Sequence, residues 1–152
     1  MTFDAHNGTR GAKQPSASPI LKLANKLMMS RARKKDATMA GMRLLALTTI
    51  GKKSGEPRST PVAWFPAGDD AWLIAASANG GAKNPAWYYN IAANPDRVTI
   101  ELGGKKIPVT AEQLHGQERT QAWTAIVESA ANFGGYEQKT DREIPVIRLT
   151  RA

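Results

Sequence analysis

Two extended apolar runs joined by a short cationic turn restrict the folds open to this chain more than any other feature. Residues 43–50, RLLALTTI, and residues 58–65, RSTPVAWF, are rich in the branched and aromatic side chains that strands favour. Between them, the glycines of GKKSGEP permit a tight reversal of the chain. The stretch predicts a strand, a turn and a second strand, and Pro61 indicates an edge or bulged position in the second strand.

The rest of the chain adds four predicted strands and two helices. Strands are predicted at 71–77, 97–102, 105–114 and 144–149, with Gly103-Gly104 as a hairpin turn. Asn84 and Pro85 mark the start of a helix that ends before Pro95, and helical spacing predicts another over 116–131. About six strands with few helices predict a mainly β fold with α, namely a small β-barrel with flanking helices.

The N-terminal part differs from the rest in composition and charge. Residues 1–18 lack periodicity and predict a disordered tail, residues 19–35 predict a basic amphipathic helix, and residues 43–152 form the predicted barrel domain. The first 60 residues hold twelve Lys/Arg and three Asp/Glu, whereas the remaining 92 hold nine and ten. The net charge of +8 therefore arises in the first part. It indicates either an anionic partner or a solvated basic arm, and the helix either packs on its own domain or lies on an anionic membrane.

Several classes of function are disfavoured by the composition. The chain has no cysteine, which excludes disulfides, thiolate catalysis and cysteine-ligated metals. No apolar run reaches the ~20 residues of a spanning helix, and the N-terminus lacks the apolar centre of a secretory signal, so a cytoplasmic protein is expected. His6 and His115 have no metal-ligand spacing, so no metal site is expected. Nucleic acid is not an expected partner, because the basic residues are not interleaved with aromatic ones.

The cationic turn has the residue types of an anion site. Lys52 and Lys53 supply point charges, Arg58 supplies a bidentate fork, and Ser54, Ser59 and Thr60 add neutral donors. Glycines on either side let successive backbone N–H groups face one anion. The alternative interpretation is an ordinary hairpin loop with exposed lysines.

Two further segments could form parts of a ligand site. Residues 75–90, AASANGGAKNPAWYYN, lead from a buried strand through small residues into a helix start, where a planar ligand could lie near free N–H groups. Residues 133–136, FGGY, could be an aromatic pair on a glycine hinge. The alternatives are a capped helix with Trp87 and Ile91 as core anchors, and a helix end with surface packing. Anion donors and aromatic faces without an evident nucleophile suit an enzyme whose cofactor carries the chemistry.

Three blocks of sequence resemble a known family. LALTTIGKKSGEPRSTPVAWF, AASANGGAKNPAWYYNIAANP and RVTIE closely resemble the deazaflavin-dependent nitroreductase family of actinobacteria, and the resemblance extends over about residues 43–150 to the ending TDREIPVIRL. Members of this family are small split β-barrel proteins of the FMN-binding type that use coenzyme F420. The resemblance therefore implies this fold and this cofactor.

The resemblance also implies roles for individual residues. The coenzyme's phosphate and acidic tail would be bound by Lys52, Lys53, Ser54 and Arg58, and its channel would continue along Ser59, Thr60, Pro61, Val62, Ala63 and Trp64. The deazaflavin ring would lie against Ala75, Ala76, Ser77 and Ala78, beside the aromatic helix start Ala86, Trp87, Tyr88, Tyr89 and Asn90. The substrate pocket would be lined by Phe133 and Tyr136. Relatives commonly carry a tyrosine where this chain has Phe133, which has no hydroxyl to donate.

The expected reaction is hydride transfer from reduced coenzyme F420 to a quinone, an enone or a nitroaromatic, with the acceptor polarised or protonated by Ser77 or Tyr136. An FMN-dependent split-barrel oxidoreductase and a non-enzymatic cofactor-binding or membrane-docking module are the alternatives. The family's N-terminal helix is sometimes linked to membranes, which implies a peripheral place at the inner face of the cell membrane for residues 19–35. Split barrels of this type often form homodimers.

Overall fold

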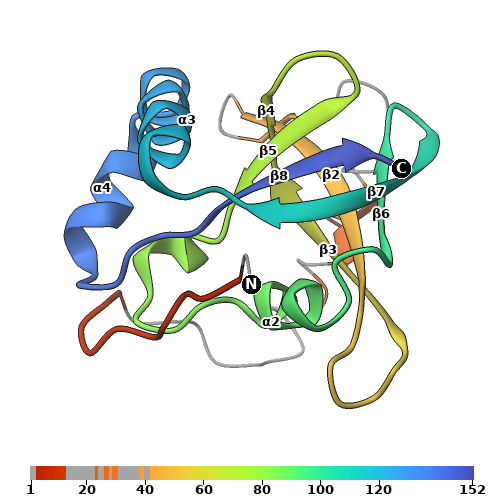
Figure 1. Cartoon of the computed structure of the whole chain (residues 1–152), viewed down its shortest axis with the longest axis horizontal. Coiled ribbons are helices and arrows are strands. Elements are labelled where there is room, and N and C mark those ends of the chain that lie inside the picture. Colours follow the sequence, from red (N-terminus) through yellow and green to blue (C-terminus); the bar gives the residue numbers. More distant parts are fainter. Residues whose placement is uncertain (1–2, 13–22, 24–25, 28, 31–37, 40–41) are drawn as a thin grey trace.

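One antiparallel sheet organises the chain (Figure 1). The computed structural model describes residues 3–12, 23, 26–27, 29–30, 38–39 and 42–152. The strands are β1 (Thr38–Met39), β2 (Met42–Ile50), β3 (Pro57–Ala63), β4 (Phe65–Pro66), β5 (Ala71–Ala75), β6 (Val98–Leu102), β7 (Lys105–Gln113) and β8 (Val146–Arg151). The helices are the 3₁₀ turn η1 (Ala78–Gly80), α2 (Ala86–Ala93), α3 (Gly116–Ser129) and α4 (Asn132–Lys139).

The sheet closes only part of a barrel. Its order is β1-β2-β6-β7-β8-β5-β4, and β3 pairs with β2 alone among the described strands. Pro61 lies opposite Ala46 in this edge strand, where its missing N–H removes no second ladder bond. The two-residue turn at Gly103-Gly104 has φ of 60° and 78°, a conformation that glycine adopts without strain. The predicted mainly β split barrel with flanking helices is confirmed.

The barrel interior is filled by the alternate side chains of its strands. Trp72 and Ile74 of β5 point inward with Leu149 of β8, whereas the intervening Leu73 faces the other side of the sheet. Helix α2 lies across one end of the barrel, with Tyr88 and Ile91 buried in the same core (Figure 1). Burial of each such apolar side chain stabilises the fold by about 1.5–3 kcal/mol.

Helices α3 and α4 cover the outer face of β5 and β8. Trp123 and Ile126 of α3 pack with Phe133 of α4 against Leu73 and Val146. A Cβ at Gly134 would meet Val127 at 3.3 Å, so a glycine lets the two helices approach closely. The predicted glycine hinge at residues 133–136 is wrong, because the whole segment is helical within α4.

The N-terminal segment is bound to the body of the protein over residues 3–12, which we call the N-terminal strap. Phe3 is only 7% exposed and its ring packs edge-on against Tyr88, 6.0 Å between centroids. Further along, the Gly8 N–H donates to Ala82 O at 2.7 Å and the Ala12 N–H donates to Gly80 O at 2.8 Å. The prediction of a disordered tail is therefore wrong for these residues.

The predicted basic helix lies largely outside the described residues. Those that are described in it, at positions 23, 26, 27, 29 and 30, are helical. Leu23 and Leu27 are 59% and 60% exposed, whereas Met29 packs against Leu44 and Ala46. The extent of the helix and its surface partner stay predictions.

Candidate functional site

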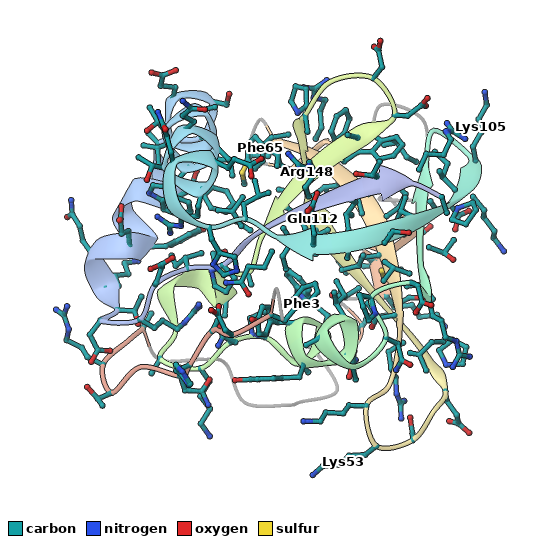
Figure 2. The ribbon with its side chains drawn as sticks, viewed as in Figure 1. Phe3, Lys53, Phe65, Lys105, Glu112 and Arg148 are labelled. Atoms are coloured by element: carbon teal, nitrogen blue, oxygen red, sulfur yellow. The ribbon has the colours of Figure 1, made fainter. Side chains whose placement is uncertain are left out.

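The turn between β2 and β3 is compact and presents its cations to solvent. Gly51 N donates to Glu56 O at 2.8 Å, and Gly55 N donates to Gly51 O at 2.9 Å. A Cβ on Gly51 would lie 2.4 Å from the Ser54 hydroxyl, so a larger residue here would require the Ser54 side chain to move. The side chains of Lys52, Lys53, Ser54 and Arg58 are all exposed. Figure 2 shows Lys53 at the far tip of the hairpin.

Helix α2 fixes the base of this turn. The Asn90 side chain accepts a hydrogen bond from Lys52 N at 2.9 Å and donates one to the Thr49 hydroxyl at 3.2 Å. The Lys52 ammonium lies 5.9 Å from the centre of the Tyr89 ring, within reach of a cation–π contact. Asn90 was expected to touch the cofactor, and the structure gives it an anchoring role between the turn and the helix.

Strand β3 leads from the cations to a tryptophan. The Ser59 hydroxyl pairs with the Thr48 hydroxyl at 2.8 Å, and residues 60–64 are half-buried. The Arg43 guanidinium lies 4.2 Å from the centre of the Trp64 ring. The Trp64 Nε1–H is buried and has no acceptor among the described residues. A buried donor without a partner is costly, so this atom is suited to an acceptor supplied by a ligand.

The small-residue loop after β5 is held by an arginine that the sequence analysis missed. Arg142 is 5% exposed, and its guanidinium donates to the Ala76, Ser77 and Gly81 carbonyl oxygens at 2.9, 2.6 and 2.8 Å. It also donates to Asn84 Oδ1 at 2.9 Å. Asn84 was predicted as the N-cap of α2, but Pro85 occupies the N-cap position and the Asn84 side chain binds Arg142 instead. Burial lowers the pKa of Arg142 from its usual value of 12.5. Arg142 lies within the TDREIPVIRL block, but nothing in the pattern of that block indicates that its side chain is buried.

The aromatic residues assigned to the deazaflavin ring and to the substrate pocket lie in two different packing clusters. Trp87 packs on the barrel core, where Tyr88 is the fully buried aromatic of α2. Phe133 is 5% exposed, and its ring is 5.6 Å from Phe65 and 5.3 Å from Tyr136. This enclosure gives Phe133 a packing role, and its place in the lining of a substrate pocket stays a prediction.

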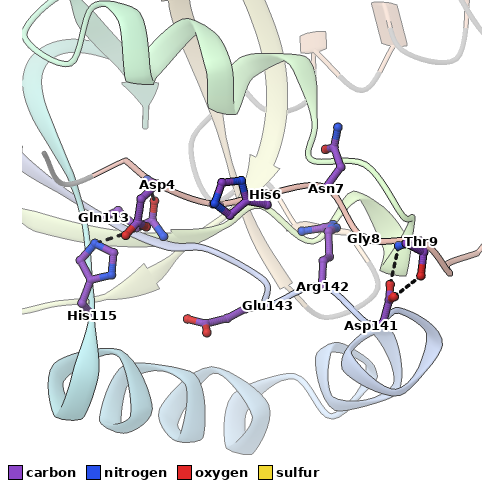
Figure 3. A pocket seen from close by; sticks show the side chains of 11 residues that line it. Asp4, His6, Asn7, Gly8, Thr9, Gln113, His115, Asp141, Arg142 and Glu143 are labelled. Atoms are coloured by element: carbon purple, nitrogen blue, oxygen red, sulfur yellow. Dashed lines mark hydrogen bonds and ion pairs between the residues drawn. The ribbon is translucent and has the colours of Figure 1, made fainter.

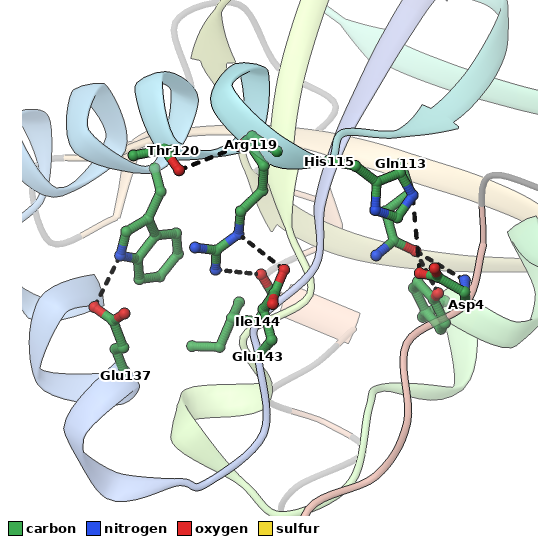
Figure 4. A network of polar contacts seen from close by, with 11 residues as sticks. Asp4, Gln113, His115, Arg119, Thr120, Glu137, Glu143 and Ile144 are labelled. Atoms are coloured by element: carbon green, nitrogen blue, oxygen red, sulfur yellow. Dashed lines mark hydrogen bonds and ion pairs between the residues drawn. The ribbon is translucent and has the colours of Figure 1, made fainter.

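Tyr136 is more accessible than Phe133. Its hydroxyl oxygen accepts from Asn132 Nδ2 at 3.1 Å, and its helix packs against η1, where a Cβ on Gly80 would lie 3.0 Å from Tyr136 O. On the same helix, Glu137 accepts from Trp123 Nε1 at 2.9 Å and so ties α4 to α3 (Figure 4). The place of Tyr136 in the substrate pocket stays a prediction.

A cleft of about 520 Å³ lies between the strap and residues 141–143 (Figure 3). It contains none of the predicted site residues. On one side of it, Asp141 accepts hydrogen bonds from the Thr9 side chain and from the Thr9 and Arg10 backbone N–H groups, and these bonds lower its pKa from 3.8 to about 2. The cleft is thus the gap beside the strap and does not coincide with the predicted coenzyme path.

Two kinds of site are not found in the part of the chain that the structure describes. No group of three or more His, Asp or Glu residues is placed to hold a metal ion. No described helix is both long and apolar enough to cross a bilayer.

The comparison with protein families decides between the cofactors considered above. A family model described as F420H(2)-dependent quinone reductase matches residues 22–151. The chain belongs to this family. Members of the F420H(2)-dependent quinone reductase family depend on reduced coenzyme F420. The expected cofactor and the expected oxidoreductase class are therefore confirmed at the level of the family, and the FMN alternative is disfavoured.

Individual proteins and solved structures that are similar to this chain support the same family assignment. An F420H(2)-dependent quinone reductase of Mycobacterium tuberculosis H37Rv is 42% identical over 110 residues, which cover 70% of this chain and 72% of that protein. A solved structure described as an F420-H2 dependent reductase, FDR-A, is 37% identical with a TM-score of 0.63, covering 70% of this chain and 92% of the other. A solved structure described as a domain-swapped dimer is 32% identical with a TM-score of 0.65, covering 86% and 96%.

The described residues fit a coenzyme with an acidic tail. Exposed Lys52, Lys53 and Arg58 on one hairpin match its negative charge, with hydroxyl donors beside them. Further along the same path, the buried Trp64 Nε1–H offers a donor that no described protein group uses.

Proposed function

We propose that this chain transfers a hydride from reduced coenzyme F420 to a quinone. The proposal is carried by the hairpin of Lys52, Lys53 and Arg58, because this member of the F420H(2)-dependent quinone reductase family presents there the cations that an acidic coenzyme tail requires. Enones and nitroaromatics are the other acceptor classes. Reduced coenzyme F420, when bound, supplies the hydride.

The protein's own residues bind and orient the reactants in this proposal. Lys52, Lys53, Ser54 and Arg58 hold the phosphate and acidic tail, and Asn90 accepts a hydrogen bond from the Lys52 backbone N–H and so holds the turn in place. The path follows Ser59, Thr60, Pro61, Val62, Ala63 and Trp64 to the ring segment Ala75, Ala76, Ser77 and Ala78, beside Ala86, Trp87, Tyr88 and Tyr89. Fixing donor and acceptor face to face removes much of the entropic barrier to transfer.

Tyr136 is the better-supported proton donor to the acceptor. Its hydroxyl oxygen accepts from Asn132, which leaves its own O–H free to donate to a substrate oxygen. Ser77 is the second candidate, since its loop adjoins the turn against which α4 packs. Tyr136→Phe is expected to lower kcat for quinones by about 100-fold with unchanged coenzyme affinity, in keeping with the loss of general acid catalysis. Full activity of Tyr136→Phe would assign the proton to another group.

The test of the reaction is a panel of acceptors. The full chain is mixed without oxygen with reduced coenzyme F420 and then with quinones, enones and nitroaromatics. We expect quinones to reoxidise the coenzyme fastest, with one quinone consumed per coenzyme. Binding of the coenzyme without turnover of any acceptor would support the non-enzymatic alternative instead.

We also propose that residues 19–35 bind an anionic membrane surface. Leu23 and Leu27 are exposed one helical turn apart with exposed Lys26 between them, which suits shallow insertion beside anionic headgroups. Co-sedimentation with phosphatidylglycerol vesicles should be lost in Leu23→Gln/Leu27→Gln and kept in Lys105→Ala/Lys106→Ala. Equal sedimentation of both variants would refute the proposal.

A homodimer is the assembly we propose. Its support is the relative described as a domain-swapped dimer, which covers 86% of this chain. Light scattering after size exclusion should give twice the chain mass of 16.4 kDa, and a monomer at micromolar concentration would contradict it.

A further inference from the structure

We infer that Arg142 is a positioning residue that holds the loop from Ala76 to Asn84 in its coenzyme-binding form, an inference that rests on the proposed function. Arg142 lies just before β8, far from the loop in sequence. Its guanidinium donates to three carbonyl oxygens and one side-chain oxygen of that loop. Four such bonds use the planar fork of an arginine, which a lysine cannot reproduce.

The bonds fix the direction of the loop's peptide planes. In a trans peptide, the C=O of one residue and the N–H of the next point in opposite directions. Because Ala76 O faces Arg142, the Ser77 N–H faces away from it. That N–H has no acceptor in the described part of the chain, although Ser77 is itself buried. The clamp therefore presents a backbone donor on the loop face opposite Arg142, and that donor is suited to an oxygen or nitrogen at the edge of a planar ring.

The loop's own backbone would not hold this shape unaided. Ala78 has φ of 46°, a conformation that costs energy for a residue with a side chain, and Gly80 has φ of 81°. Ser77 O accepts from both Gly80 N at 2.8 Å and Arg142 Nη2 at 2.6 Å. The guanidinium thus compensates local backbone strain in the segment proposed to meet the coenzyme ring.

The charge of Arg142 also lacks a carboxylate partner among the described residues. The neighbouring carboxylates are engaged elsewhere: Asp141 binds the strap, and Glu143 lies 3.5 Å from Arg119 (Figure 4). Carbonyl dipoles alone therefore satisfy the buried cation. A structural arginine would more commonly face a carboxylate, since burying an unpaired charge is costly.

The test compares Arg142→Lys and Arg142→Met with Arg148→Lys and Arg148→Met. Arg148 is a matched control because it is also on the C-terminal segment and hydrogen-bonded, but it pairs with Glu112 and Glu118 on the outer face of the sheet. The readouts are the Kd of oxidised coenzyme F420 from fluorescence, the KM of the reduced coenzyme, the KM of a quinone, and thermal melting. Both Arg142 variants should raise coenzyme Kd and KM about tenfold or more, with quinone KM within about twofold.

Several results would overturn the inference. A folded Arg142→Lys with wild-type coenzyme affinity would show that a positive charge alone is sufficient to hold the loop. A fall in kcat with unchanged coenzyme KM would indicate only a loss of folded protein. If neither Arg142 variant folds, Asn84→Ala removes one of the four acceptors and should raise coenzyme Kd about threefold, while an unchanged Kd would refute the inference. If the wild-type chain binds no coenzyme F420, it is the proposed function that fails.

Discussion

Replacing Lys53 and Arg58 together with alanine should weaken coenzyme binding strongly at low salt and mildly at high salt. Both side chains are exposed on the hairpin and anchor no buried contact, so the fold should survive the change. Lys52 is left in place because its backbone is tied to Asn90. The change therefore removes charge from the anion site without releasing the turn from α2.

The expected magnitude follows from exposure. A solvent-exposed ion pair contributes about 0.2–1 kcal/mol, and the fork of Arg58 belongs near the upper end. Loss of both contacts therefore raises Kd by about tenfold in dilute buffer. The Debye length falls from roughly 30 Å at 0.01 M to about 8 Å at 0.15 M salt, so the ratio of Kd values should shrink to about threefold.

The assay is quenching of the fluorescence of oxidised coenzyme F420 at the two salt concentrations. Lys105→Ala/Lys106→Ala is the control, since it removes the same charge from a hairpin at the opposite end of the barrel (Figure 2). It should leave Kd within about twofold of wild type. Wild-type affinity of the Lys53→Ala/Arg58→Ala variant at low salt, or equally weakened binding by the control, would show that the hairpin does not bind the coenzyme's acidic tail.

Three further predictions concern the strap and α2. Tyr88→Phe should lower the free energy of unfolding by about 2 kcal/mol and the Tm by about 4–8 °C, because the buried hydroxyl bonds the strap and β7. Burial raises the pKa of Tyr88 above 10.0, so the free energy of unfolding of the wild type should fall as pH rises above 10. The difference in free energy of unfolding between wild type and Tyr88→Phe should therefore become smaller there, and a difference that stays constant with pH in denaturant titrations would contradict this. Phe3→Ala should cost about 3 kcal/mol by the same assay, and an unchanged Tm would show that the strap is not bound. The pKa of Asp141 is lowered to about 2, so its hydrogen bonds to the strap persist above pH 3.8 and are lost as pH falls towards 2. Hydrogen exchange of the Thr9 and Arg10 amides should accelerate over that pH range. Asp141→Asn lacks the carboxylate at every pH and should show no such acceleration.

Local sequence signals were sufficient for most of the barrel. The period-two pattern of residues 105–114 and the turn at Gly103-Gly104 depend on neighbours in the sequence, and β7 and its hairpin follow them. The apolar run at 43–50 likewise became β2, which is paired on both sides. Pro61 indicated the edge strand because proline lacks the donor for a second neighbour.

The missed features depend on contacts between distant parts of the chain. Phe3 is one aromatic residue in a polar, glycine-bearing stretch, and only the barrel end beside Tyr88 gives that stretch a place to bind. Gly134 and Gly135 argue against a helix on propensity, but packing against Val127 favours one. Arg142 was not singled out, because its acceptors lie about 60 residues earlier in the sequence and no local pattern connects them with it. Part of the candidate site could thus be predicted as a list of binding segments, but not the groups that hold them.

The most direct test of the central claim is anaerobic single-turnover mixing of the full chain with reduced coenzyme F420 and a quinone. We expect the absorbance of oxidised coenzyme F420 to return at a rate that saturates with protein concentration, with one quinol formed per coenzyme. The same mixing with reduced FMN should give only the protein-free rate. If the coenzyme binds but is not reoxidised faster than in buffer, or if reduced FMN reacts at an equal rate, the protein is not an F420-dependent quinone reductase.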